Sequence, residues 1–197
     1  KDMFSALFHN DQAMLTVITI VLINSALYIT SNLILYFFKY DLGTELWKNN
    51  YTLFTTIGGA TQILGMMVLY PVLRNKLSNT TIFKTSLCMA ILGYALLLFA
   101  SFMNLAHNMV ILCLIGALVF SANGMLSVLT TVFLSTSVDY GEMKTGRREE
   151  SVIFSMQTFV VKAASGLAVF LTGIGLDMIG LAGNSEDGIP AVQSAST

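Results

Sequence analysis

The sequence predicts an all-α membrane protein with five transmembrane helices, and three observations lead to this fold class. Of the 197 residues, 55% are hydrophobic and only 11% are charged, whereas soluble domains carry about 25% charged residues. The mean hydropathy of +0.74 excludes a disordered chain. The charged residues are grouped, and long neutral runs separate the groups. These runs lack the alternation of polar and apolar residues that is typical of barrel strands.

Five neutral runs are long enough to cross a bilayer, because a helix needs about 20 residues to span a hydrocarbon core about 30 Å thick. The first four runs contain no Asp, Glu, Lys or Arg, and the fifth contains one such residue, Lys162. In lipid each helical span satisfies its own backbone hydrogen bonds, so we expect a helical bundle. The predicted spans cover about residues 14–38, 51–73, 85–106, 108–138 and 151–176.

The Lys and Arg residues between the spans predict the orientation. Seven of them fall at the N-terminus and in the loops after the second and fourth spans, and two, Lys39 and Lys48, fall on the opposite side. This asymmetry places the N-terminus in the cytoplasm. We expect residues 1–182 to form a transmembrane bundle, and residues 183–197 to form an extracytoplasmic loop or tail before a missing last helix.

Polar side chains recur at helical spacing along four spans, so that each set shares one face. Such amides and hydroxyls either bond neighbouring helices together or line a water-filled cavity, and the sequence leaves both interpretations open. In the fifth span, Ala164, Ala168 and Thr172 form a ridge of small residues that lets helices approach closely. The polar sets are Asn24, Tyr28 and Ser31; Thr52, Thr55 and Gln62; Asn123, Ser127 and Thr131; and Gln157, Thr158 and Lys162.

Lys162 is the most informative residue, because it lies 11 residues after Ser151, roughly 16 Å into a core about 30 Å thick. A lysine at that depth costs about 2.5–3.5 kcal/mol on insertion scales and normally faces a cavity. No Asp or Glu lies within the five predicted spans. We therefore expect the counter-charge of Lys162 to come from helices outside this chain. The alternative is a structural cation bound by carbonyls and amides.

The charged segment between the fourth and fifth spans, 139–150, is predicted to be a solvated cytoplasmic loop. With the helix that follows, it resembles the glycoside–pentoside–hexuronide:cation symporters of the major facilitator superfamily. The resemblance rests on the pattern Asp139-Tyr140-Gly141-Glu142-x-Lys144-x-Gly146-x-Arg148, followed by Gln157-Thr158 and Lys162 on an apolar helix. It implies twelve helices in two halves, of which this chain would supply helices seven to eleven, a partial C-terminal six-helix half.

The resemblance also implies roles for single residues. Lys162 would lie near the cation and sugar sites, and Gln157 and Thr158 would face the sugar cavity. We add Asn123, on the polar face of the fourth span, to the expected sugar-binding residues. The main ligands of the coupling cation, Na⁺ or H⁺, are expected on the missing N-terminal half. The charges expected to close a cytoplasmic gate are Asp139, Glu142 and Arg148.

The sequence therefore predicts part of a secondary active transporter, a sugar:cation symporter of the cell membrane that works by alternating access. The expected partners are a sugar, the lipid bilayer and the missing N-terminal half, and no nucleic acid, enzymatic activity, metal site or cofactor is expected. One alternative is a non-catalytic membrane subunit or channel with a structural lysine. Another is a pigment or membrane enzyme that uses Lys162 as an amine nucleophile.

Overall fold

The computed structural model describes residues 11–41, 46–103, 108–145 and 150–178. Within these ranges the chain is helical and contains no strand. Five helices are long and apolar enough to cross a membrane, which confirms the predicted all-α membrane fold. They are Met14–Lys39, Trp47–Arg74, Asn79–Phe102, Met109–Lys144 and Glu150–Met178. The predicted tail, 183–197, lies outside the described residues.

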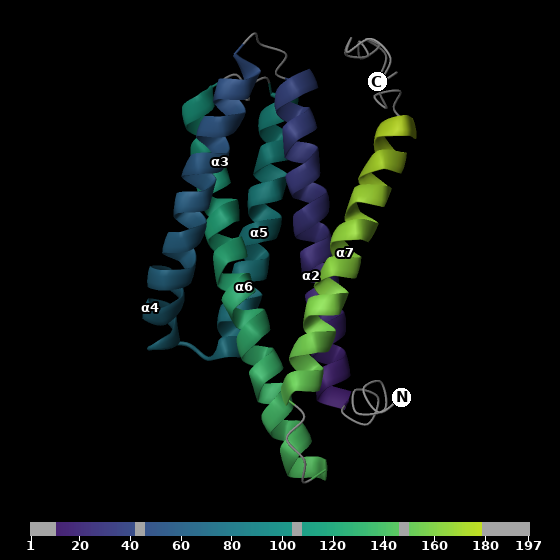
Figure 1. Ribbon diagram of the computed structural model, residues 1–197. Coiled ribbons are helices and arrows are strands. Elements are labelled where there is room, and N and C mark those ends of the chain that lie inside the picture. Colours follow the sequence, from purple (N-terminus) through teal and green to yellow (C-terminus); the bar gives the residue numbers. More distant parts are fainter. Residues whose placement is uncertain (1–10, 42–45, 104–107, 146–149, 179–197) are drawn as a thin grey trace. The chain divides into compact units, whose positions relative to one another are not determined.

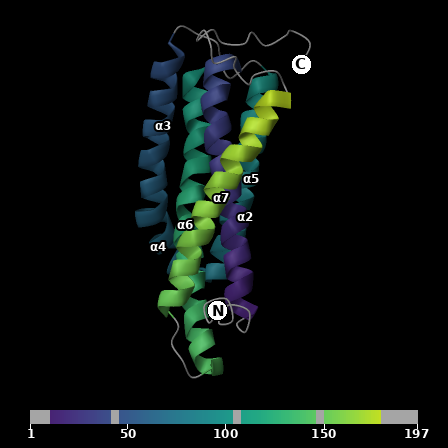
Figure 2. The same cartoon turned by 45° about the vertical axis from the view of Figure 1, so that its right-hand side comes forward.

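Figure 1 and Figure 2 show the helices as long rods. Two of the spans are composite, because a short π-helix ends the first and interrupts the second. The elements in order are α2 (Asp11–Tyr36), η1 (Phe37–Asp41), α3 (Trp47–Leu64), η2 (Gly65–Leu69), α4 (Tyr70–Arg74), α5 (Asn79–Phe102), α6 (Met109–Thr145) and α7 (Glu150–Met178).

The chain divides into two compact units. Unit 1 comprises Lys1–Gly43 and Thr136–Thr197, and unit 2 comprises Thr44–Ser135. Helix α6 therefore contributes its first part to unit 2 and its last residues to unit 1. In unit 1, α2 and α7 pack side by side (Figures 1 and 2). A hydrogen bond of 2.9 Å between the hydroxyls of Thr16 and Ser137 links α2 to the end of α6.

In unit 2, α3 and α6 cross at glycines that leave room for aromatic rings. A Cβ atom added to Gly58 would lie 2.5 Å from the ring of Phe120, and one added to Gly116 would lie 2.5 Å from the ring of Phe54. The two rings also meet each other edge to face, with centroids 5.8 Å apart. Each helix thus places a phenylalanine on the glycine of the other, which fixes the register between them.

The same two helices approach backbone to backbone further along. A Cβ on Gly65 would lie 2.5 Å from the carbonyl oxygen of Ser121, and one on Gly124 would overlap the carbonyl oxygen of Gln62. Small residues at such crossings supply the close packing that drives helix association in membranes. Gly59 lies on the same helix as Gly58 and Gly65, yet no heavy atom lies within 4 Å of its added Cβ.

Helix α5 begins at Asn79, whereas the apolar run predicts a start near residue 85. Ser78 is the reason, because its hydroxyl accepts a hydrogen bond of 3.3 Å from the backbone N–H of Thr81 and caps the helix. Next to this end, Ile82 packs with Met125 and Leu129 of α6 in a fully buried cluster. The cap and the cluster hold the start of α5 against α6.

The expectation that the loop begins at Asp139 was wrong. Helix α6 continues to Thr145, so the signature segment from Asp139 to Lys144 is helical. One side of this helical segment is packed, since Gly141 is buried and Val138 just before it is 2% exposed, while Asp139, Met143 and Lys144 are exposed. No proline interrupts the run, and packing outweighs the modest helix penalty of a single glycine, about 1 kcal/mol.

Candidate functional site

Helix α7 carries most of the predicted site residues, and its packing against α2 decides which way they face. A stripe of buried side chains runs along the helix, and the predicted ridge Ala164, Ala168 and Thr172 lies at its centre. These small side chains permit close approach of a neighbouring helix. The complete buried stripe is Ile153, Met156, Ala164, Ala168, Thr172 and Leu176.

A second stripe of α7 is polar and lies beside the buried one. Its members follow one another at intervals of three or four residues and therefore share a flank of the helix. All but the half-buried Ser165 are exposed. We call this set the polar stripe; it consists of Ser151, Ser155, Thr158, Lys162 and Ser165.

The hydroxyls of the polar stripe donate their hydrogen bonds within α7. Ser155 donates to the carbonyl oxygen of Ser151 at 2.6 Å, and Thr158 donates to that of Phe154 at 3.0 Å. Ser165 donates to the carbonyl oxygen of Lys162 at 2.8 Å. Since these three hydroxyl donors are used inside the helix, Ser155, Thr158 and Ser165 present oxygen lone pairs beside the cationic donor group of Lys162.

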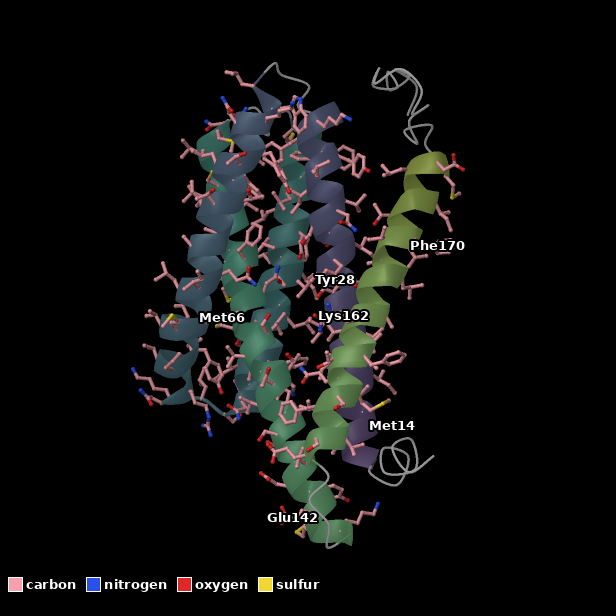
Figure 3. All side chains as sticks on the ribbon, viewed as in Figure 1. Met14, Tyr28, Met66, Glu142, Lys162 and Phe170 are labelled. Atoms are coloured by element: carbon pink, nitrogen blue, oxygen red, sulfur yellow. The ribbon has the colours of Figure 1, made fainter. Side chains whose placement is uncertain are left out.

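Lys162 provides that cationic group, and it is exposed. It lies near the middle of α7 in Figure 3, at a height similar to that of Tyr28 on the neighbouring helix α2. Among the described residues, its ammonium has no hydrogen-bond or ion-pair partner. A charge at the middle of a span costs about 2.5–3.5 kcal/mol on insertion scales unless it reaches water or a partner. The exposed flank of α7 is therefore suited to an aqueous path or to polar groups of another chain segment.

Gln157 and Thr158 do not face the same way. Thr158 lies four residues before Lys162 and shares its flank, whereas Gln157 is turned about 140° from Lys162 around the helix axis. Gln157 falls four residues after the buried Ile153 and is itself half-buried. The structure thus groups Thr158 with Lys162 and places Gln157 on the side where the helix packs.

Asn123 lies in unit 2, whereas the other three predicted sugar-binding residues lie in unit 1. Its side chain is 7% exposed. The amide nitrogen donates a hydrogen bond of 3.4 Å to the hydroxyl of Tyr94 on α5, and the amide oxygen has no partner among the described residues. Its role in sugar binding remains a prediction.

The predicted gate residues lie on the last turns of α6. Asp139 is exposed and Glu142 is half-buried. Figure 3 shows Glu142 near the end of α6, well away from the level of Lys162 along the helices of unit 1. Arg148 lies outside the described residues, so its pairing with these carboxylates stays a prediction.

Most of the remaining polar residues predicted to line a cavity bond their own helix. Asn24 donates to the carbonyl oxygen of Ile20 at 2.8 Å, and Ser127 donates to that of Asn123 at 2.9 Å. Sequence reasoning missed Ser151, Ser155 and Ser165 as neighbours of Lys162. The signal that could have found them is their spacing of three or four residues from one another and from Lys162.

Five long apolar helices and a lysine at mid-span define a multi-pass membrane protein of the cell membrane. Comparison with known families then identifies the chain further. It belongs to the family described as MFS/sugar transport protein, which matches residues 1–197. This match confirms the resemblance to sugar symporters of the major facilitator superfamily.

Curated relatives cover most of this chain. A lactose permease of Lactobacillus helveticus is 28% identical over 189 residues, which are 94% of this chain and 27% of the relative. An uncharacterised symporter of Bacillus subtilis is 29% identical over 182 residues, 90% of this chain and 37% of that protein. An isoprimeverose transporter of Lactiplantibacillus pentosus is 27% identical over 166 residues, which are 83% of this chain and 33% of that protein. The chain thus spans between 27% and 37% of the length of these relatives.

Proposed function

We propose that this chain is the C-terminal part of a secondary active transporter that couples the uptake of a sugar to Na⁺ or H⁺. Membership of the sugar transport family supports the sugar as the transported class. The names of the relatives, lactose permease and isoprimeverose transporter, indicate glycosides as the first substrates to test. We propose a transport function and no enzymatic one.

The observation that carries the proposal is the exposed ammonium of Lys162 on the polar stripe of α7. Sugar hydroxyls both donate and accept hydrogen bonds, so they suit a surface that combines hydroxyl oxygens with one strong cationic donor. A lipid-facing role is disfavoured, because a charged side chain at the bilayer centre is costly. The polar stripe would therefore line one wall of the sugar path.

The other wall would come from an N-terminal six-helix half, and the relatives are long enough to contain one, since this chain covers 27–37% of them. That half would supply the carboxylates that bind the coupling cation and neutralise Lys162. Binding of the cation would alter the charge balance around Lys162 and shift the equilibrium between outward-open and inward-open states. On the cytoplasmic side, Asp139, Glu142 and Arg148 would stabilise the closed gate.

Uptake of radiolabelled lactose and isoprimeverose into proteoliposomes tests this proposal. The natural full-length protein that contains this chain would be assayed with a Na⁺ gradient, with a H⁺ gradient and with neither. We expect one gradient to drive accumulation of a sugar above its external concentration. Flux that only equilibrates the sugar under all three conditions would instead favour the channel alternative, and no sugar flux at all would favour the non-catalytic subunit.

A further inference from the structure

Unit 2 contains a cluster of cations with which no carboxylate of the described residues pairs. Arg74 ends α4, Lys76 follows it, and Lys84 lies near the start of α5. All three side chains are exposed. The sequence contains no Asp or Glu between Leu46 and Val138. We call these three residues the basic cluster.

The fold brings the basic cluster to one end of unit 2. Figure 1 shows α4 and the start of α5 at the same end, and the hydroxyl of Tyr70 donates a hydrogen bond of 3.4 Å to the amide oxygen of Asn79 across the two helices. Arg74 makes one long contact, 3.5 Å, from its guanidinium to the carbonyl oxygen of Leu77. Among the described residues no carboxylate pairs with the cluster. The positive-inside asymmetry puts this end in the cytoplasm.

An apolar groove lies along the helix that leads to the basic cluster, and its lining residue nearest to the cluster in sequence, Leu69, precedes Arg74 by five residues. It runs between α3–η2 and α6, and its volume is about 490 Å³. Leu64, Val68 and Leu114 are between 49% and 68% exposed along it. The lining residues are Thr61, Leu64, Val68, Leu69, Leu114, Ala117, Leu118 and Ser121.

The groove extends from Leu69 at its near end to Thr61 at its far end, and the far end lies about one bilayer leaflet below the cations. Thirteen residues separate Thr61 from Arg74, which at 1.5 Å per residue is about 20 Å. Half of the hydrocarbon core is about 15 Å. A lipid of the cytoplasmic leaflet with its phosphate at Arg74 therefore has acyl chains of the length needed to reach the groove.

We propose that unit 2 binds an anionic phospholipid of the cytoplasmic leaflet, with the headgroup at Arg74, Lys76 and Lys84 and one acyl chain in the groove. Charge complementarity carries the choice of occupant, because a cytoplasmic leaflet rich in anionic lipid attracts clustered Lys and Arg residues at helix ends. An apolar helix from another segment would fill the groove but would leave the three cations without a counter-charge. An anionic phospholipid supplies both a counter-charge for the three cations and an acyl chain for the groove.

The test measures phosphatidylglycerol retained by the natural full-length protein after purification from mixed phosphatidylglycerol and phosphatidylcholine vesicles. The variant Arg74→Gln/Lys76→Gln/Lys84→Gln removes the cluster, and Lys48→Gln is the matched control, since Lys48 is an exposed cation at the opposite end of α3. We expect the wild type and the control to retain phosphatidylglycerol selectively. In the triple variant the affinity for phosphatidylglycerol should fall by about fivefold for each charge removed, and the amount of retained phosphatidylglycerol should fall with it. Equal retention by all three proteins would overturn the proposal.

A second measurement separates lipid binding from a folding defect. Phosphatidylglycerol that carries a photoreactive group on its acyl chain would be cross-linked to the wild type and to the Lys48→Gln control. We expect labelled peptides from residues 61–69 and 114–121, and we expect unlabelled phosphatidylglycerol to compete more strongly than phosphatidylcholine. Labels distributed evenly over the apolar surface, or competition that ignores the headgroup, would contradict the proposed site.

Discussion

The glycine crossing between α3–η2 and α6 makes a quantitative prediction about stability. In the variant Gly65→Ala, the new Cβ would lie 2.5 Å from the carbonyl oxygen of Ser121. That oxygen belongs to the backbone, so no side chain can rotate away. Relief to an ordinary contact of about 3.4 Å requires the helices to separate by roughly 0.9 Å. A gap of 0.5–1 Å forfeits about a quarter to a half of the dispersion attraction across a contact.

Two energies oppose each other in this variant. Overpacking of a tight interface costs about 1–3 kcal/mol, and alanine in place of glycine stabilises a helix by about 0.5–1 kcal/mol. We therefore expect Gly65→Ala to lower the free energy of unfolding by about 1–2 kcal/mol. The matched control is Gly59→Ala on the same helix, where the Cβ meets no heavy atom within 4 Å. It should be neutral or slightly stabilising.

The assay is an unfolding titration of the purified full-length protein in mixed detergent micelles, followed by circular dichroism of the helices. The prediction concerns the difference between the two variants, because both remove one glycine from α3–η2 and add one methyl group. If Gly65→Ala and Gly59→Ala unfold at the same detergent composition, the close approach at Ser121 is not a stabilising contact. A Gly65→Ala variant more stable than wild type would refute the reasoning outright.

Two further predictions concern unit 2 and use the same titration. Phe54 is 2% exposed and lies on Gly116, so Phe54→Ala should lower the free energy of unfolding by about 3 kcal/mol or more. The control is Leu53→Ala, at a side chain that is 49% exposed. It should change the free energy of unfolding little, because lipid replaces the lost contacts. The variant Ser78→Ala leaves the N–H of Thr81 without its acceptor and should lower the free energy of unfolding by about 1 kcal/mol. An unchanged midpoint of the unfolding titration for Phe54→Ala or for Ser78→Ala would contradict the role assigned to that residue.

The sequence was sufficient for the number and the approximate extent of the spans, because hydrophobic length is a property of each segment alone. The small-residue ridge of α7 was also predictable from the spacing of Ala164, Ala168 and Thr172. The start of α5 at Asn79 could have been found too, since Ser78 stands at a capping position before an apolar run.

Pairings between helices could not be predicted in the same way. Nothing in the sequence states that Phe54 meets Gly116 while Phe120 meets Gly58, because the register of two packed helices depends on both surfaces together. The helical conformation of Asp139–Lys144 was missed for a related reason. Charged residues and Gly141 suggest a loop, but the segment is helical and Gly141 is buried, and burial is a tertiary property.

Some residues of the candidate site could be placed from the sequence, and others could not. Lys162 was identified by its depth in an apolar span, and the structure leaves it exposed on the polar stripe; its role in transport stays a prediction. Gln157 was grouped with it by proximity in sequence, although adjacent helical residues point about 100° apart. Asn123 was grouped by polarity alone, and its place in unit 2 beside Tyr94 could not be inferred without the fold.

The most direct test of the proposed function is the sugar accumulation ratio of Lys162→Gln compared with that of the wild type, in proteoliposomes under the coupling gradient. Loss of a charged hydrogen-bond donor costs about 1.5–3 kcal/mol, so we predict that the affinity for the sugar falls by about tenfold or more and that accumulation at sub-saturating sugar within a fixed uptake time falls with it. Lys162→Arg should retain part of it, and Lys48→Gln should match the wild type. Full gradient-driven accumulation by a correctly folded Lys162→Gln protein would contradict the claim that this ammonium lies in the transport path.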